Sequence, residues 1–264
     1  MKRSTLYLLV PVLLVLAGVS ACKSQYEQIM ESSDPDVKYN AAFDYFNAGK
    51  YSRAIQLFES LSLLTNGTER HDTVLYYLGL SNYSYRDYYT AETNFDQYLS
   101  YYPQGAFSET AEFLRIDCLY RSTLRYELDQ TPTNTAIIAM GEYLRAHPVG
   151  ANADIVRHRM QELGERLDRK AFENARLYYK MEDYKAARVA LKNVLKDDAD
   201  NVYREEILYY SAMASYKFAE NSVASKQKER FLVFQDDYLN FIGEYPESEH
   251  RKELDALYDK VKEK

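Results

Sequence analysis

Apolar and polar positions along the chain follow a repeated three-point pattern. An aromatic residue is followed three positions later by alanine, and four positions after that by a large apolar residue. The copies are Tyr51, Ala54 and Phe58; Tyr88, Ala91 and Phe95; and Tyr184, Ala187 and Leu191. Spacings of three and four place these side chains on one face of an α-helix. The pattern predicts amphipathic helices, each with a small residue in its apolar face.

A second helix is predicted before each copy, over 39–48, 74–85 and 171–181. Ala54 and Ala91 lie 37 residues apart, close to the roughly 34 of a tetratricopeptide unit. Proline cannot continue a helix, so Pro103, Pro148 and Pro246, each five residues after an aromatic, predict helix ends. We therefore predict an all-α fold, a right-handed α-α superhelix of about five tetratricopeptide-like helix pairs plus a C-terminal helix.

The spacing is less regular in the middle of the chain. Ala91 and Ala136 lie 45 residues apart, which indicates an insertion, and the polar stretch 129–134 is interpreted as a loop that precedes the next helix. A long polar helix is predicted over 154–179 and a final helix over 247–262. We divide the repeats into an N-terminal part, 36–150, and a C-terminal part, 151–264.

The first 21 residues have the features of a signal peptide. Lys2 and Arg3 precede an apolar run over 6–16, which is too short for a comfortable membrane span. Residues 19–22, Val-Ser-Ala-Cys, resemble the bacterial lipobox, in which the cysteine is acylated. We therefore predict that Cys22 is lipidated and that 22–35 is a linker; the alternative is an ordinary signal peptide and an incidental cysteine. Lys23 rather than aspartate follows the cysteine, which favours the outer membrane.

Composition excludes several classes of function. The formal charge is −7 and no basic block is present, so nucleic-acid binding is not expected. The histidines are far apart and no Gly-x-Ser-x-Gly, P-loop or dinucleotide turn occurs, so we expect no catalytic residues, no metal site and no cofactor. With Cys22 lipidated, Cys118 has no disulfide partner and is expected to be buried. The 27 tyrosines, with no tryptophan, suit grooves that bind other chains.

The chain resembles the BamD family of outer-membrane assembly lipoproteins. The lipobox, the repeats and four stretches carry this resemblance: 54–59, Tyr101-Tyr102-Pro103, the block 129–131 leading into Ala136, and 245–248. The resemblance implies a lipid-anchored protein on the periplasmic face of the outer membrane. It also implies two partners: a BamA-like barrel protein and unfolded outer-membrane proteins.

Two sets of binding residues are predicted for these partners. One is a peptide groove lined by aromatic and apolar side chains of the first helices: Tyr39, Phe43, Phe46, Tyr76, Leu80, Tyr83, Phe113 and Tyr120. Packing within the repeats is the alternative role for each of them. The other set is Arg157 and Arg159, in the more heavily charged C-terminal part, where a folded partner would dock.

Two other classes of function remain open from the sequence. A generic lipid-anchored adaptor, such as a pilotin or envelope scaffold, would use the same repeats for another partner. A glycan-binding lipoprotein of the SusD type is disfavoured because those proteins are about twice as long and because tryptophan, the usual stacking platform for sugars, is absent.

Overall fold

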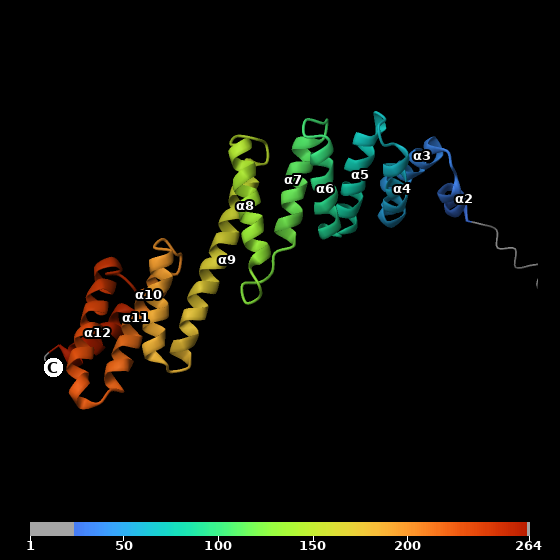
Figure 1. Ribbon diagram of the computed structural model, residues 1–264. Helices are drawn as coiled ribbons and strands as arrows, with labels where there is room; N and C mark the ends of the chain where they lie inside the picture. Colours follow the sequence, from blue (N-terminus) through green and yellow to red (C-terminus); the bar gives the residue numbers. More distant parts are fainter. Residues whose placement is uncertain (1–23, 263–264) are drawn as a thin grey trace, which may run out of the picture. The chain divides into compact units, whose positions relative to one another are not determined.

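The computed structural model describes residues 24–262, and within them the chain forms twelve α-helices and no strand (Figure 1). The helices belong to two compact units, which divide between Arg121 and Ser122. We describe each unit by itself.

Unit 1 is a succession of helices in which each packs on the next. Its elements are α2 (Gln25–Glu31), α3 (Pro35–Asn47), α4 (Tyr51–Leu64), α5 (Arg70–Tyr85), α6 (Tyr88–Tyr101) and α7 (Ser108–Arg121). Two apolar cores hold it together. One lies among α3, α4 and α5 around Phe58 and Leu57; the other lies among α5, α6 and α7 around Phe95 and Tyr98.

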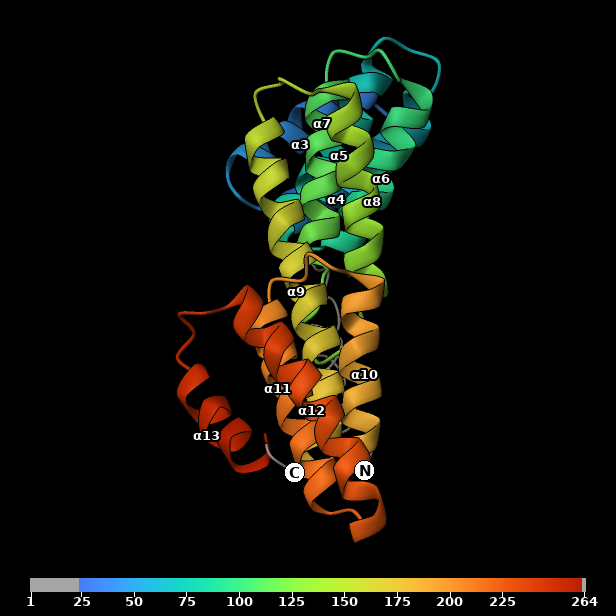
Figure 2. The same ribbon diagram turned by 90° about the vertical axis from the view of Figure 1, so that its left-hand side faces the viewer.

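Unit 2 begins with the loop 122–130 and contains six helices. They are α8 (Thr131–Ala146), α9 (Ala153–Lys180), α10 (Tyr184–Asp197), α11 (Arg204–Glu220), α12 (Ala224–Glu244) and α13 (Arg251–Val261). Helix α9 packs on α8, α10 and α11. Figure 2 shows α10, α11 and α12 running side by side, and their core includes Phe234 and Phe241.

Small residues allow neighbouring helices to approach closely. The alanines of the repeated pattern, Ala54, Ala91 and Ala187, have no exposed surface. Gly79 on α5 has the same role, because a Cβ atom at that position would lie 2.8 Å from the Phe95 ring on α6. Each hairpin has an apolar face that it cannot bury alone, so these contacts between hairpins create the core.

The turns inside the hairpins share one geometry. Gly49, Arg86 and Glu182 have positive φ angles of 71°, 69° and 62°. A left-handed residue at this position ends the first helix of each pair. After Arg86 and Glu182, Asp87 and Asp183 accept hydrogen bonds from backbone N–H groups of the next helix, at 3.1 and 3.0 Å, and so cap it.

The predicted register, helix ends and fold class are confirmed. The chain is a helical repeat, and α6, α8 and α12 each end two residues before a proline of the predicted breaks. The predicted long helix over 154–179 is α9, and the predicted last helix is α13, which begins at Arg251.

The structure differs from the sequence-based expectations at three places. The predicted linker contains helix α2, which has a complete capping box at Ser24 and packs Tyr26, Ile29 and Met30 on the first core. Helix α8 begins at Thr131, inside the predicted loop, because proline is tolerated in the first turn of a helix. The compact units divide at Arg121 rather than near residue 150, since α8 packs along α9.

We expect Ala54→Trp and Ala91→Trp each to lower the free energy of unfolding by roughly 1–3 kcal/mol, because an indole cannot fit where a neighbouring helix passes. Urea unfolding of the purified variants would measure this change. Ala256→Trp, at an exposed position on α13, is the control for adding a large apolar side chain. Unchanged urea midpoints for both Ala54→Trp and Ala91→Trp would contradict the predicted register of the repeats.

Candidate binding surfaces

Unit 1 carries a row of half-buried aromatic rings on α3, on α5 and just before α7. We call Tyr39, Phe43, Phe46, Tyr77 and Phe107 the aromatic row. The ring centroids of Phe43 and Phe46 lie 4.7 and 5.3 Å from that of Tyr77, and Tyr77 lies 6.3 Å from Phe107. Tyr39 is at the other end of the row, where its ring centroid lies 4.9 Å from that of Phe43. Each ring keeps part of its surface exposed, so the row can contact another aromatic or apolar chain.

Tyr77 and Phe107 were not among the groove residues predicted from the sequence. The predicted residue was Tyr76, which is only 7% exposed and packs in the core of α5, α6 and α7. Its ring stacks on Phe107 with centroids 4.2 Å apart and planes at 8°. The tyrosine doublet at 76–77 was the available signal, but periodicity alone did not distinguish its two members.

Tyr83, another predicted groove residue, belongs to a polar cluster. Its hydroxyl donates a hydrogen bond to Asp117 Oδ2 at 2.6 Å, and Asp117 is buried. Arg121 forms an ion pair with the same carboxylate and lies over the Tyr83 and Tyr88 rings, 5.7 and 5.3 Å from their centroids. Burial, together with the hydrogen bond to Asp117, raises the pKa of Tyr83 to about 12. The cluster joins α5, α6 and α7.

The remaining predicted groove residues are half-buried. Leu80 packs against the second core, and Phe113 and Tyr120 lie on α7. Cys118 is buried, as expected, and burial raises the pKa of its thiol to about 12. Cys22, the predicted lipidation site, lies outside the residues that the structure describes.

The two predicted docking residues of unit 2 occupy different environments on α9. Arg157 is exposed, and its guanidinium donates hydrogen bonds to the Asp154 carboxylate and to the carbonyl oxygen of Pro148. Arg159, two residues further along, is half-buried. Because residues two apart do not share a helix face, the structure does not bring the two guanidinium groups together.

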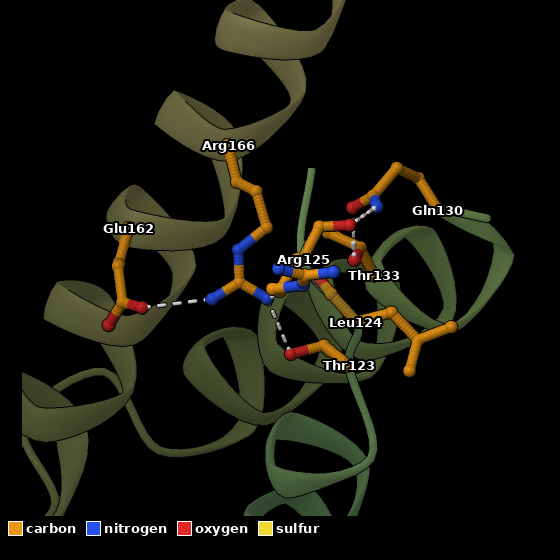
Figure 3. Close-up of polar contacts among 7 residues, drawn as sticks. All are labelled: Thr123, Leu124, Arg125, Gln130, Thr133, Glu162 and Arg166. Atoms are coloured by element: carbon orange, nitrogen blue, oxygen red, sulfur yellow. Dashed lines mark hydrogen bonds and ion pairs between the residues drawn. The ribbon is translucent and has the colours of Figure 1, made fainter. Parts of the chain in front are cut away.

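A second group of cations on α9 holds the loop 122–130, in an arrangement that we call the loop clasp (Figure 3). Arg166 donates hydrogen bonds to Thr123 Oγ1 at 2.7 Å and to the Leu124 carbonyl at 3.0 Å, and it also pairs with Glu162 at 3.0 Å. One turn further along, Lys170 Nζ lies 3.1 and 2.7 Å from the carbonyl oxygens of Tyr126 and Leu128.

The loop has its own internal support. Gln130 is buried, and its amide donates to the carbonyl oxygens of Arg125 and Leu128 at 2.8 and 3.0 Å. Thr133 in turn donates to Gln130 Oε1 at 2.8 Å. Residues 129–131, part of the stretch predicted to be a loop before the next helix, thus connect loop 122–130 to the start of α8.

An open cleft of about 470 Å³ lies beside the loop clasp. Arg125, Arg166 and Arg169 line it together with Tyr126, Tyr203 and three glutamates. The guanidinium of Arg169 lies 4.3 Å from the Tyr126 ring centroid, a cation–π contact. Within residues 24–262 no group of three or more His, Cys, Asp or Glu side chains could hold a metal ion, and no helix is long and apolar enough to cross a membrane.

The comparison with protein families defines the class of this chain. The model of the YfiO family, described as an outer membrane lipoprotein, matches residues 31–232 and so includes most of both units. The chain therefore belongs to the YfiO family of outer membrane lipoproteins.

Two individual proteins are similar to the chain. The outer membrane protein assembly factor BamD of Caulobacter vibrioides is 21% identical over 216 residues, which cover 81% of this chain and 71% of that protein. Among solved structures, a TPR repeats protein from Bacteroides fragilis is 17% identical, with a TM-score of 0.40, and the match covers 88% of this chain and 99% of that one.

We expect Lys170→Met to release the loop 122–130, because the methionine keeps the apolar stem but cannot donate to the carbonyl oxygens. Loss of hydrogen bonds from a charged donor should cost about 1.5–3 kcal/mol. Faster amide exchange and protease cleavage confined to 122–130 would measure the release. Lys228→Met, at an exposed position on α12, is the control. Equal exchange rates in the two variants would show that Lys170 does not hold the loop.

Proposed function

We propose that this protein is a lipid-anchored periplasmic subunit of the machinery that assembles β-barrel proteins in the outer membrane. The observation that carries the proposal is the family match over both units, together with a relative that is named as an outer membrane protein assembly factor. In this role the protein binds a BamA-like barrel protein and unfolded segments of outer-membrane proteins. It acts by binding rather than by catalysis.

The aromatic row is the proposed site for unfolded barrel segments. Barrel strands alternate apolar and polar side chains and are rich in aromatics near the membrane interfaces. Half-exposed tyrosine and phenylalanine rings present both a face and an edge to such side chains. Each aromatic pair formed contributes about 0.5–1.5 kcal/mol to binding beyond the burial of apolar area. Several weak contacts in series suit a chain that must later be released.

The proposed docking surface for the folded barrel protein is the charged face of α9 that includes Arg157; Arg159, the second predicted docking residue, lies on a neighbouring, half-buried part of the same helix. An exposed guanidinium on a rigid helix suits recognition of a carboxylate on a folded partner. Copurification from detergent-solubilised outer membranes tests the assignment: recovery of a BamA-like protein supports it. Recovery of a secretion or envelope component instead would favour the adaptor role.

We expect Tyr39→Ala combined with Phe46→Ala to weaken capture of an unfolded barrel segment while copurification of the barrel protein persists. These rings lie on α3, and their half-exposed faces are lost in the variant. Cross-linking of a synthetic segment with alternating aromatic residues would measure capture. Tyr101→Ala is the control, because Tyr101 is an exposed tyrosine outside the aromatic row. Normal capture together with loss of the barrel protein would reverse the assignment of the two units.

We expect Arg157→Glu to reduce copurification of the barrel protein more strongly than Arg157→Gln does. Both variants lose the hydrogen bond to the Pro148 carbonyl and the ion pair with Asp154, and the glutamate also repels Asp154. A loss of copurification beyond that explained by lower stability reports a charge-dependent contact with the partner, and this loss should shrink at high salt because ions screen exposed charges. Thermal unfolding of the two variants, measured in parallel, gives the structural contribution.

A further inference from the structure

The predicted lipid anchor is very close in sequence to the ordered part of the chain. Cys22 lies two residues before Ser24, the N-cap of α2. Ser24 Oγ accepts a hydrogen bond from the Glu27 N–H at 3.3 Å, and the Glu27 carboxylate accepts one from the Ser24 N–H at 2.7 Å. Two residues of extended chain span at most about 7 Å. An acyl group on Cys22 would therefore hold α2 at the membrane surface.

Helix α2 packs on the rest of unit 1, so a membrane contact of α2 would also position the first hairpin, α3–α4. The Tyr26 ring meets the Tyr45 ring edge to face, with centroids 5.5 Å apart, and the Tyr26 hydroxyl donates to Gln56 Oε1 at 2.6 Å. Tyr45 belongs to the last turn of α3, and Gln56 to the first half of α4. The start of α2 thus lies beside the turn between α3 and α4.

Exposed cations gather around this turn. Arg53 lies over the Tyr26 and Tyr45 rings, 5.1 and 5.4 Å from their centroids, and Lys50 Nζ lies 5.8 Å from that of Tyr45. The next hairpin turn, between α5 and α6, carries the exposed Arg86 and Tyr89. Figure 1 shows this turn at the lower edge of unit 1, opposite the α4–α5 and α6–α7 loops.

The cations of unit 1 divide into paired and unpaired side chains. Among the described residues of the unit, Lys38 donates to Ser60, and Arg70 and Arg115 form ion pairs. Arg121, which lies over the Tyr83 and Tyr88 rings beside the α5–α6 turn, pairs with the buried Asp117. The described cations that form neither an ion pair nor a side-chain hydrogen bond are at the hairpin turns: Lys50, Arg53 and Arg86. Acidic side chains are present nearby, namely Asp44, Glu59 and Asp87.

We propose that this edge, formed by the start of α2 and the α3–α4 and α5–α6 turns, rests on the phospholipid headgroups of the membrane that carries the anchor. Lys50, Arg53 and Arg86 would meet lipid phosphates, and the tyrosines Tyr26, Tyr45 and Tyr89 would lie at the boundary of headgroups and acyl chains. Cations and amphipathic rings have these positions at membrane surfaces. The inference rests on the proposed lipidation of Cys22.

The contact gives the anchored unit a defined orientation. A lipid on a long flexible linker would let unit 1 turn freely, whereas a tether of two residues and a second contact at the α5–α6 turn hold one edge down. The opposite edge, with the loops at 65–69 and 102–107, then points away from the membrane.

The absence of tryptophan from the sequence allows a direct test with single tryptophan reporters. The chain starting at Cys22 is coupled through that thiol to a maleimide lipid in vesicles of phosphatidylethanolamine and phosphatidylglycerol with brominated acyl chains. Cys118 is fully buried and does not compete for the maleimide. The reporters are Tyr26→Trp and Tyr89→Trp at the proposed edge and, as the control, Tyr101→Trp, 59% exposed at the opposite edge.

Bromine quenching of both edge reporters several-fold stronger than that of Tyr101→Trp is the expected result. Equal quenching at all three positions, stronger quenching of the control, or none at any position would overturn the proposal. Lys50→Glu with Arg86→Glu, added to Tyr26→Trp, should reduce quenching on the anionic vesicles and have little effect on phosphatidylcholine vesicles. Glutamate is compatible with the backbone at 86, since Glu182 adopts the same left-handed conformation in the corresponding turn.

A separate measurement distinguishes this inference from the proposed lipidation. The mass of the amino-terminal peptide from native membranes reports whether the cell acylates Cys22. An unmodified cysteine would refute the anchor, whereas the vesicle experiment, in which the lipid is supplied chemically, reports the contact face alone. An acylated Cys22 together with equal quenching at both edges would overturn only the contact face.

Discussion

Close approach of one helix to the next at small residues is the contact on which the fold depends. Ala54, Ala91 and Ala187 are fully buried, and Gly79 leaves no room for a methyl group beneath the Phe95 ring. A two-helix hairpin cannot bury its apolar face alone, so each pair acquires a core only from its neighbour. A larger side chain at these positions would separate the hairpins and open that core to water.

The aromatic row follows from the same packing. Because α3 and α5 lie close enough for Phe43 and Phe46 to contact Tyr77, rings from two hairpins form one continuous surface instead of separate patches. Tyrosine suits these positions, since its ring packs and its hydroxyl can reach water or a polar partner. Where the hydroxyl is directed inward, as in Tyr83, a buried carboxylate accepts a hydrogen bond from it.

The sequence predicted the features that depend on spacing along one helix, and less of those that depend on distant parts of the chain. The alanine positions and the proline breaks were predicted correctly because each is a local property of one helix. Tyr76 and Tyr77 were not distinguished, since α5 is buried on much of its circumference. The loop clasp was not predicted because Lys170 bonds to main-chain carbonyl oxygens more than 40 residues away, and such acceptors occur at every residue.

The internal contacts of unit 1 determine which of its charged side chains remain available to bind a partner. Arg121 is held by a buried carboxylate, and Arg115 lies between two acidic residues of α6, so neither is free to bind a partner. Once such residues are set aside, the remaining cations mark one edge, beside the helix that follows the predicted anchor. A sum of charges over this acidic chain would hide that edge, because opposite charges cancel in the sum but not in space. The distribution of unpaired charge, rather than its net value, is therefore what supports the proposed contact of unit 1 with a membrane surface.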